Sequence, residues 1–202
     1  MKGFSIIALL MVMAVIFCSM PSVASAEREM TSYVAVKPGV FFPLSELDDK
    51  GFDTSFAGLV TVGTYQSPNL ALETSLGYIS TRAEKKMSTG WEDLDLWVVP
   101  LQVTIKAVLP IRPLELSVGA GGGLYFTTAR ARGYENEAGD YSHRDHDIAY
   151  GGHLDAGATF DLGGRMFLGV EGQYHMTTSA KIYGSKVRLN GITATSVVGF
   201  RF

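Results

Sequence analysis

The chain has 202 residues, a formal net charge of −3 and only 18% charged residues, so it lacks the basic balance of a nucleic-acid-binding protein. Its length suits one domain behind a short leader. Apolar residues make up 47% of the chain, yet no apolar run after residue 26 is long enough for a membrane-spanning helix. Abundant but interrupted apolar residues are typical of strands in which they occupy alternate positions.

The first 26 residues have the pattern of a secretory signal peptide. Lys2 gives a positive start, residues 6–17 form an apolar run, and residues 24–26 (Ala-Ser-Ala) form a cleavage motif. We therefore predict cleavage after Ala26 and a mature domain over residues 27–202. An uncleaved anchor is the alternative, but the run is short for a bilayer and no positive flank follows it.

The single cysteine lies inside this leader. Phe17 precedes Cys18, whereas a lipoprotein signal has a small residue there, so lipidation is not expected. The mature chain then has no disulfide, and a closed hydrogen-bonded sheet would have to supply its stability.

Eight stretches of the mature chain alternate between apolar and polar residues, which predicts half-buried strands. In chain order they are 33–42, 56–65, 70–80, 94–109, 114–129, 148–162, 165–178 and 189–202.

The connections between these strands alternate in length. Short turns are predicted at 66–69, 110–113 and 163–164, where Gly, Pro, Ser and Asn gather. Long polar loops are predicted at 43–55, 81–93, 130–147 and 179–188. Short turns at one end and long loops at the other are typical of outer-membrane barrels. The prediction is an all-β fold, an eight-stranded antiparallel up-and-down transmembrane β-barrel.

Residue parity separates two faces in most strands. In the strand over 165–178, Leu168 and Val170 share one face, while Glu171 and His175 share the other. A soluble carrier would put the apolar face inside, and a membrane barrel would put it outside. The polar face also carries many glycines, which would make room for long side chains in the narrow interior of an eight-stranded barrel. The membrane arrangement is therefore favoured.

Aromatic residues gather toward the predicted strand ends, as in the interfacial belts of membrane proteins. This set contains Phe41, Phe42, Tyr65, Tyr78, Trp97, Tyr125, Phe126, Tyr150, Phe160, Phe200 and Phe202.

In the last strand the residues of the two faces alternate up to the terminal phenylalanine, and Phe200 and Phe202 lie on one face. This resembles the C-terminal signature of outer-membrane barrels, which the barrel-assembly machinery recognises. Residues 69–73 and 76–78 also resemble the small barrels of the OmpA, OmpX and OmpW types. The resemblance implies a bacterial outer-membrane location and lipid and lipopolysaccharide as neighbours, and the chain is expected to lack a C-terminal peptidoglycan-binding domain. It implies no particular activity, because these families include adhesins, anchors, channels and enzymes.

The predicted lumen carries charges of both signs. A paired, hydrogen-bonded plug is expected, because an unpaired buried charge is costly; a gated ion path through the same groups is the alternative. The expected lumen network comprises Lys37, Glu73, Lys106, Glu115, Asp155, Glu171, His175 and Arg201.

Two further motifs carry less weight. His175 followed by Thr177 departs from the His and Ser of outer-membrane lipid A deacylases, and parity points His175 into the lumen, so no enzyme activity is expected. The 130–147 segment is expected to be a solvated, mobile loop, with divalent-cation binding as the alternative. Its candidate ligands are the histidines and carboxylates that lie near Tyr134, namely Glu135, Glu137, Asp140, His143, Asp145, His146 and Asp147.

The sequence thus predicts a monomeric outer-membrane barrel with a structural or surface-interaction role, no cofactor, no metal and no nucleic-acid partner. A narrow channel for ions or small apolar molecules is the second hypothesis, and a lipid A-modifying enzyme is the third.

Overall fold

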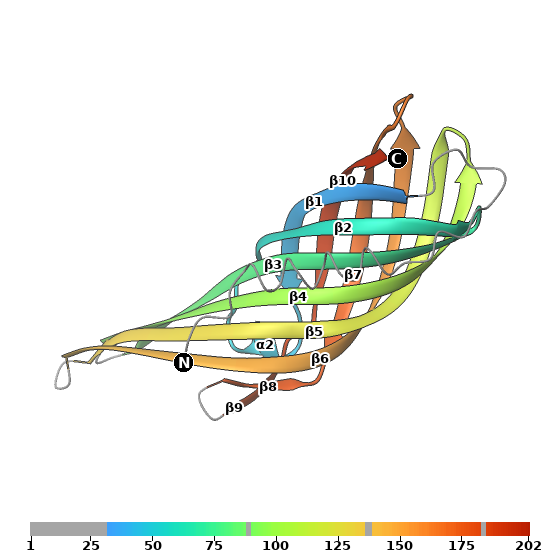
Figure 1. The fold of residues 1–202 in the computed structure, drawn as a ribbon. Coiled ribbons are helices and arrows are strands. Elements are labelled where there is room, and N and C mark those ends of the chain that lie inside the picture. Colours follow the sequence, from blue (N-terminus) through green and yellow to red (C-terminus); the bar gives the residue numbers. More distant parts are fainter. Residues whose placement is uncertain (1–31, 88–89, 136–138, 183–184) are drawn as a thin grey trace.

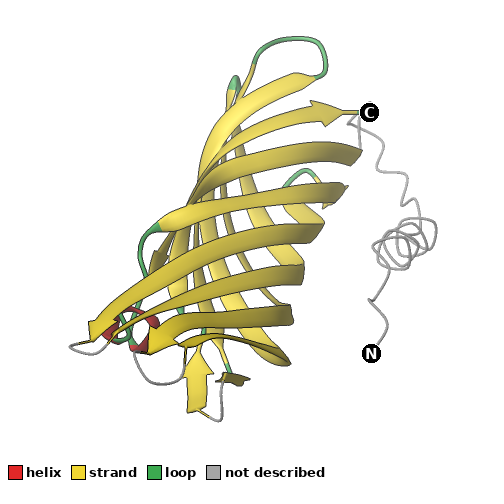
Figure 2. Ribbon diagram, turned by 90° about the vertical axis from the view of Figure 1, so that its left-hand side faces the viewer, coloured by secondary structure: helices red, strands yellow, loops and turns green. Residues whose placement is uncertain are grey.

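The computed structural model describes residues 32–202 apart from 88–89, 136–138 and 183–184. Eight long antiparallel strands close into a barrel (Figures 1 and 2) in the order β1-β10-β7-β6-β5-β4-β3-β2. Each barrel strand lies beside its neighbours in the sequence, and the seam is closed by the first and last strands. The barrel strands are β1 (Ser32–Pro43), β2 (Ser55–Ser67), β3 (Leu70–Met87), β4 (Gly90–Ile111), β5 (Leu114–Glu135), β6 (Gly139–Asp161), β7 (Met166–Thr177) and β10 (Gly191–Arg201).

The eight predicted strands and the three short turns are confirmed. These turns lie at one end of the barrel, called here the turn end. At the other end, called the loop end, two predicted loops contain small elements. The loop after β1 forms helix α2 (Glu46–Asp49), and the segment between β7 and β10 forms the hairpin of β8 (Ser179–Ile182) and β9 (Ser185–Arg188).

The barrel wall is apolar on its outer face. Ile105 and Val170 are 59% and 62% exposed, whereas Lys37 and Lys106, on the opposite face, are 2% and 4% exposed. The predicted arrangement of the faces is therefore confirmed, and the soluble-carrier alternative is wrong. A bilayer requires an apolar outer face and a closed sheet that leaves no backbone group unpaired in the hydrocarbon, and this barrel has both.

Glycines make room for the charged interior, as the sequence suggested. A Cβ built on Gly119 would lie 2.6 Å from Oδ2 of Asp155 and 2.8 Å from Cγ of Lys106. A side chain at this position would therefore displace the charged groups packed against the backbone.

The predicted loops at 81–93 and 130–147 are wrong for most of their length. Beyond Ile79 in β3 and Gly151 in β6, the ladders to β2 and β7 stop, while β3, β4, β5 and β6 continue to pair with one another. Figure 1 shows these four strands running on past the barrel as a tilted sheet. Residues outside a membrane need no apolar face, so the alternating pattern ends although the hydrogen-bonded ladder does not.

Candidate functional site

All eight residues of the predicted lumen network point into the barrel. Lys37, Glu73, Lys106, Asp155 and His175 are buried. The Glu115, Glu171 and Arg201 side chains keep 11–15% of their surface. The inward positions follow from strand parity. The pairing of these groups depends on the barrel register, which the sequence alone does not give.

The charged residues at mid-barrel form one ion-paired cluster, called here the central network. Lys37 Nζ lies 3.1 Å from Glu73 Oε2 and 2.9 Å from Glu171 Oε1. Lys106 Nζ lies 3.0 Å from the same Glu73 oxygen and 3.4 Å from Asp155 Oδ1, and it also pairs with Glu171. Two cations thus hold three carboxylates from opposite walls and offset charges that would be costly to bury singly. Among the described residues neither Asp155 oxygen has a hydrogen-bond partner, so its ion pair with Lys106 is the contact that offsets its charge.

A second polar group lies toward the turn end. Tyr65 donates to Glu115 Oε1 at 2.6 Å, and Arg201 pairs with both Glu115 and Asp161. The Arg201 guanidinium also lies 4.5 Å from the ring centroid of Phe167, a cation–π distance.

A third polar group, neutral in composition, lies toward the loop end. Gln102 Nε2 donates to Tyr125 Oη at 2.9 Å, and His175 Nε2 lies 2.7 Å from Thr193 Oγ1. His153 Nε2 of β6 lies 2.8 Å from Thr104 Oγ1 of β4, across the intervening strand β5. These side chains interlock across the lumen above the central network.

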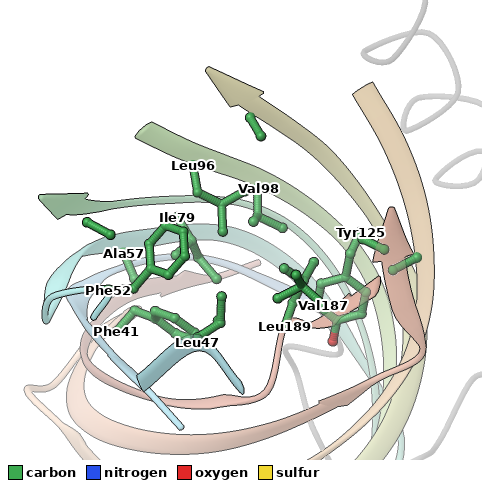
Figure 3. Packing of buried hydrophobic residues seen from close by; sticks show 14 residues of the cluster. Phe41, Leu47, Phe52, Ala57, Ile79, Leu96, Val98, Tyr125, Val187 and Leu189 are labelled. Atoms are coloured by element: carbon green, nitrogen blue, oxygen red, sulfur yellow. The ribbon is translucent and has the colours of Figure 1, made fainter. Parts of the chain in front are cut away.

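A cluster of buried apolar residues, called here the apolar cap, lies at the loop end of the lumen (Figure 3). Leu47 of α2 and Phe52 of the same loop pack against Ile79 and Leu96 of the barrel wall, and Leu189 packs in from the opposite side. The backbone N–H of Arg188 donates to Glu46 Oε2 at 2.8 Å, which ties the hairpin to α2. Two segments far apart in the sequence thus form one lid.

Two small cavities lie inside the part of the barrel that the structure describes. A cavity of about 30 Å³ lies beside Lys37, Glu73 and Tyr33, and another of about 10 Å³ lies under the cap beside Leu47 and His175. Each has room for about one water molecule. The neutral polar group separates them.

Sequence reasoning missed the tyrosines of the lumen. Tyr65 and Tyr125 were expected in an interfacial belt with Phe41, but the structure buries all three inside. Tyr33 also lies inside and donates a hydrogen bond to Glu73. A Cβ built on Gly63 would lie 2.2 Å from Cζ of Tyr33, so a ring covers the bare backbone opposite it. Glycine on the inward face of a neighbouring strand was the available signal.

The remaining predicted aromatic residues have outward parity. Tyr78 and Tyr150 near the loop end, and Phe160 near the turn end, are exposed, and so are Phe200 and Phe202 of the proposed assembly signal. Among the described residues no helix is long and apolar enough to cross a bilayer.

The structure corrects the prediction that residues 130–147 form a solvated loop. It belongs to β5 and β6, and Glu137 lies outside the described residues. Within the part of the chain that the structure describes, no group of three or more His, Cys, Asp or Glu side chains is arranged to hold a metal ion. The expected signal peptide, residues 1–26 with Cys18, lies outside the described residues as well.

The comparisons with known proteins agree with this architecture. A family model described as "outer membrane protein beta-barrel domain" matches residues 10–202. The solved structure of Neisserial surface protein A is 17% identical, with a TM-score of 0.53 over 85% of this chain and 97% of that one. The outer membrane protein OprG from Pseudomonas aeruginosa is 13% identical, with a TM-score of 0.50 over 86% of this chain and 97% of that one. No curated protein matches the chain.

Proposed function

The chain belongs to the outer-membrane β-barrel family, and from this premise we propose that it acts as a closed barrel with a structural or surface-interaction role in the bacterial outer membrane. In this proposal the leader is cleaved after Ala26, and the barrel works as a monomer without cofactor, metal or enzymatic activity. Phe200 and Phe202 serve as the signal read by the assembly machinery.

The central network is the observation that best supports a closed lumen. Lys37 and Lys106 meet Glu73 and Glu171 from opposite walls at ion-pair distances. A hydrated ion could pass only if these pairs separated, and each separation would leave charges buried without a partner. The apolar cap adds a second closure above them.

The surface role is supported by the four-stranded extension of β3–β6. It is built from long hydrogen-bonded ladders that continue beyond the barrel, so it holds a fixed surface at the loop end. The exposed loop end of an outer-membrane barrel faces the outside of the cell, where a rigid surface suits contact with other molecules.

Conductance across a planar bilayer tests the closed lumen. We expect wild-type protein to give no reproducible unitary currents at either polarity, because a passing ion would have to separate the ion pairs of the central network. Lys106→Met and Glu73→Gln alter this network, and Lys186→Met, on the exposed hairpin, is the matched control. Unitary currents in the wild type that disappear in Lys106→Met or Glu73→Gln but persist in Lys186→Met would contradict the proposal.

A narrow channel is the second candidate, and one observation favours it. The 30 Å³ cavity lies directly beside Lys37 and Glu73, so a rearrangement of these side chains would enlarge a space that already exists. The currents just described are the result that would support this candidate.

A further inference from the structure

The outer wall of β3–β6 changes from apolar to cationic within a few residues. The strand register lines up rows of outward side chains, and successive rows are about 7 Å apart along the strands. The apolar row contains Val99, Phe126 and Ile148. The next row toward the loop end contains Ser80, Trp97, Thr128 and His146. The row beyond it, called here the arginine row, contains Arg82, Asp95, Arg130 and Arg144.

Asp95 orients two arginines of this surface, Arg82 and Arg132. Its Oδ1 lies 2.7 Å from Arg82 Nε, and its Oδ2 lies 2.6 Å from Nη2 of Arg132, which comes from the next row. Asp95 keeps 7% of its side-chain surface, while Arg82 and Arg132 keep 55% and 43%. The carboxylate therefore lies beneath the two guanidiniums and leaves them at the surface.

The Asp95 carboxylate is charged in this arrangement. Burial would raise the pKa of Asp95, but hydrogen bonds and positive charge from Arg82 and Arg132 outweigh burial and lower that pKa below its ordinary value. Asp93 of β4 and its register partner Glu84 of β3 lie one row farther out on the same face. Four arginines (Arg82, Arg130, Arg132 and Arg144) against these three carboxylates leave this patch positive.

The position of the patch selects its partner. A lipid lying along this wall would place its acyl chains against Phe126 and Ile148, and its headgroup at the height of the arginine row. Trp97 lies between them, at the level where indole rings favour the interface. Arginine guanidiniums bind phosphate oxygens through paired N–H donors, and basic side chains beside a membrane attract anionic headgroups. A free phosphate or a soluble peptide would make no use of the apolar rows below.

We propose that Arg82, Arg130, Arg132 and Arg144 form a binding site for the phosphate groups of an outer-leaflet lipid whose acyl chains lie against the apolar row. The partner class is a phosphorylated glycolipid such as the lipid A part of lipopolysaccharide. The proposal rests on the outer-membrane location and is independent of whether the lumen conducts.

Native mass spectrometry of the folded barrel tests this site. The ligands are bisphosphorylated lipid A, lipid A lacking both phosphates, and inorganic phosphate as a competitor. The test variant is R130Q/R144Q, which leaves Arg82, Asp95 and Arg132 in place. The matched control is R112Q/R165Q, which removes two arginines from the turn end.

We expect R130Q/R144Q to bind bisphosphorylated lipid A about tenfold more weakly than wild type, and the control to stay within about twofold. Removing both phosphates from the lipid should weaken wild-type binding about tenfold and change binding to R130Q/R144Q little. If R130Q/R144Q does not fold, R130K/R144K takes its place; it keeps the charge but loses the planar fork, and about a threefold loss is expected.

Other outcomes would overturn the site. Equal losses in the test and control pairs would indicate general charge attraction. Undiminished binding of the unphosphorylated lipid would remove the headgroup from the interaction, and displacement by equimolar inorganic phosphate would indicate a simple anion site. The conductance of R130Q/R144Q should equal that of wild type, so a failed lumen proposal and a failed lipid site are distinguishable.

Discussion

At the scale of single residues, glycines on the inner face of the barrel leave space for the large side chains of the lumen. Gly119 faces Lys106 and Asp155, and Gly121 faces the ring of His153, whose Nε2 would lie 2.6 Å from an added Cβ. Real Cβ atoms do not approach so closely, so the charged side chains and rings of the lumen occupy volume that the glycines vacate. The tight packing therefore depends on the backbone of the neighbouring strand as much as on the polar groups.

Gly119→Ala should lower the free energy of unfolding by about 1–3 kcal/mol, because the added methyl group overpacks a crowded interior. Gly172→Ala is the matched control, since a Cβ at this outward position meets nothing within 4 Å. Urea unfolding in vesicles, followed by tryptophan fluorescence, measures both. Equal effects of the two substitutions would mean that glycine matters here through strand propensity rather than through lumen space.

Single residues also show which features of the candidate site could be predicted from the sequence and which could not. Parity assigns Glu73, Lys106 and Glu171 to one face because alternation in a strand is strict. Parity does not say that Lys37 and Lys106 share Glu73 and Glu171, since that pairing requires the register of the whole closed sheet. Tyrosine is ambiguous for a different reason: its ring suits a lipid interface, and its hydroxyl suits a polar lumen.

At the scale of elements, the strand cores were predictable and their extensions were not. Inside the bilayer each strand must present apolar side chains outward, so residues such as those over 98–109 alternate clearly. Outside the bilayer the outer face of the sheet meets water, and on this face the β3–β6 extension carries charged residues such as Arg82, Asp95 and Arg132. A polar stretch of this kind has the composition of a loop, although its backbone pairs as a strand.

Helix α2 and the β8–β9 hairpin, which form the lid, are held by contacts between two different loops. Leu47→Ala should raise the rate of tryptic cleavage after Lys50 about tenfold or more, because the loss of a buried leucine costs about 2–5 kcal/mol and favours local opening of the cap. Asp49→Ala, an exposed position on the same helix, should leave this rate within about twofold. Equal cleavage of the two variants would show that Leu47 does not anchor the lid.

At the scale of the whole molecule, stability depends on closing the sheet. Without β10, both β1 and β7 would present unpaired backbone groups to hydrocarbon, where each such group costs several kcal/mol. Removing residues 191–202 should therefore abolish the compact, heat-sensitive band of the folded barrel on a detergent gel. Removing the β8–β9 hairpin, which forms its own two-stranded sheet, should preserve that band. A compact band from the shorter barrel would mean that seven strands suffice.

The pairing of Tyr33 with Arg201 and of Val34 with Phe200 at the seam determines when the barrel can close. The strand β1 is translated first and its partner β10 last, so the sheet cannot close while the chain is still being synthesised. We therefore expect the two edges of the unsealed sheet to stay open until synthesis of the last strand is complete, a consequence of strand order that no local sequence motif reveals.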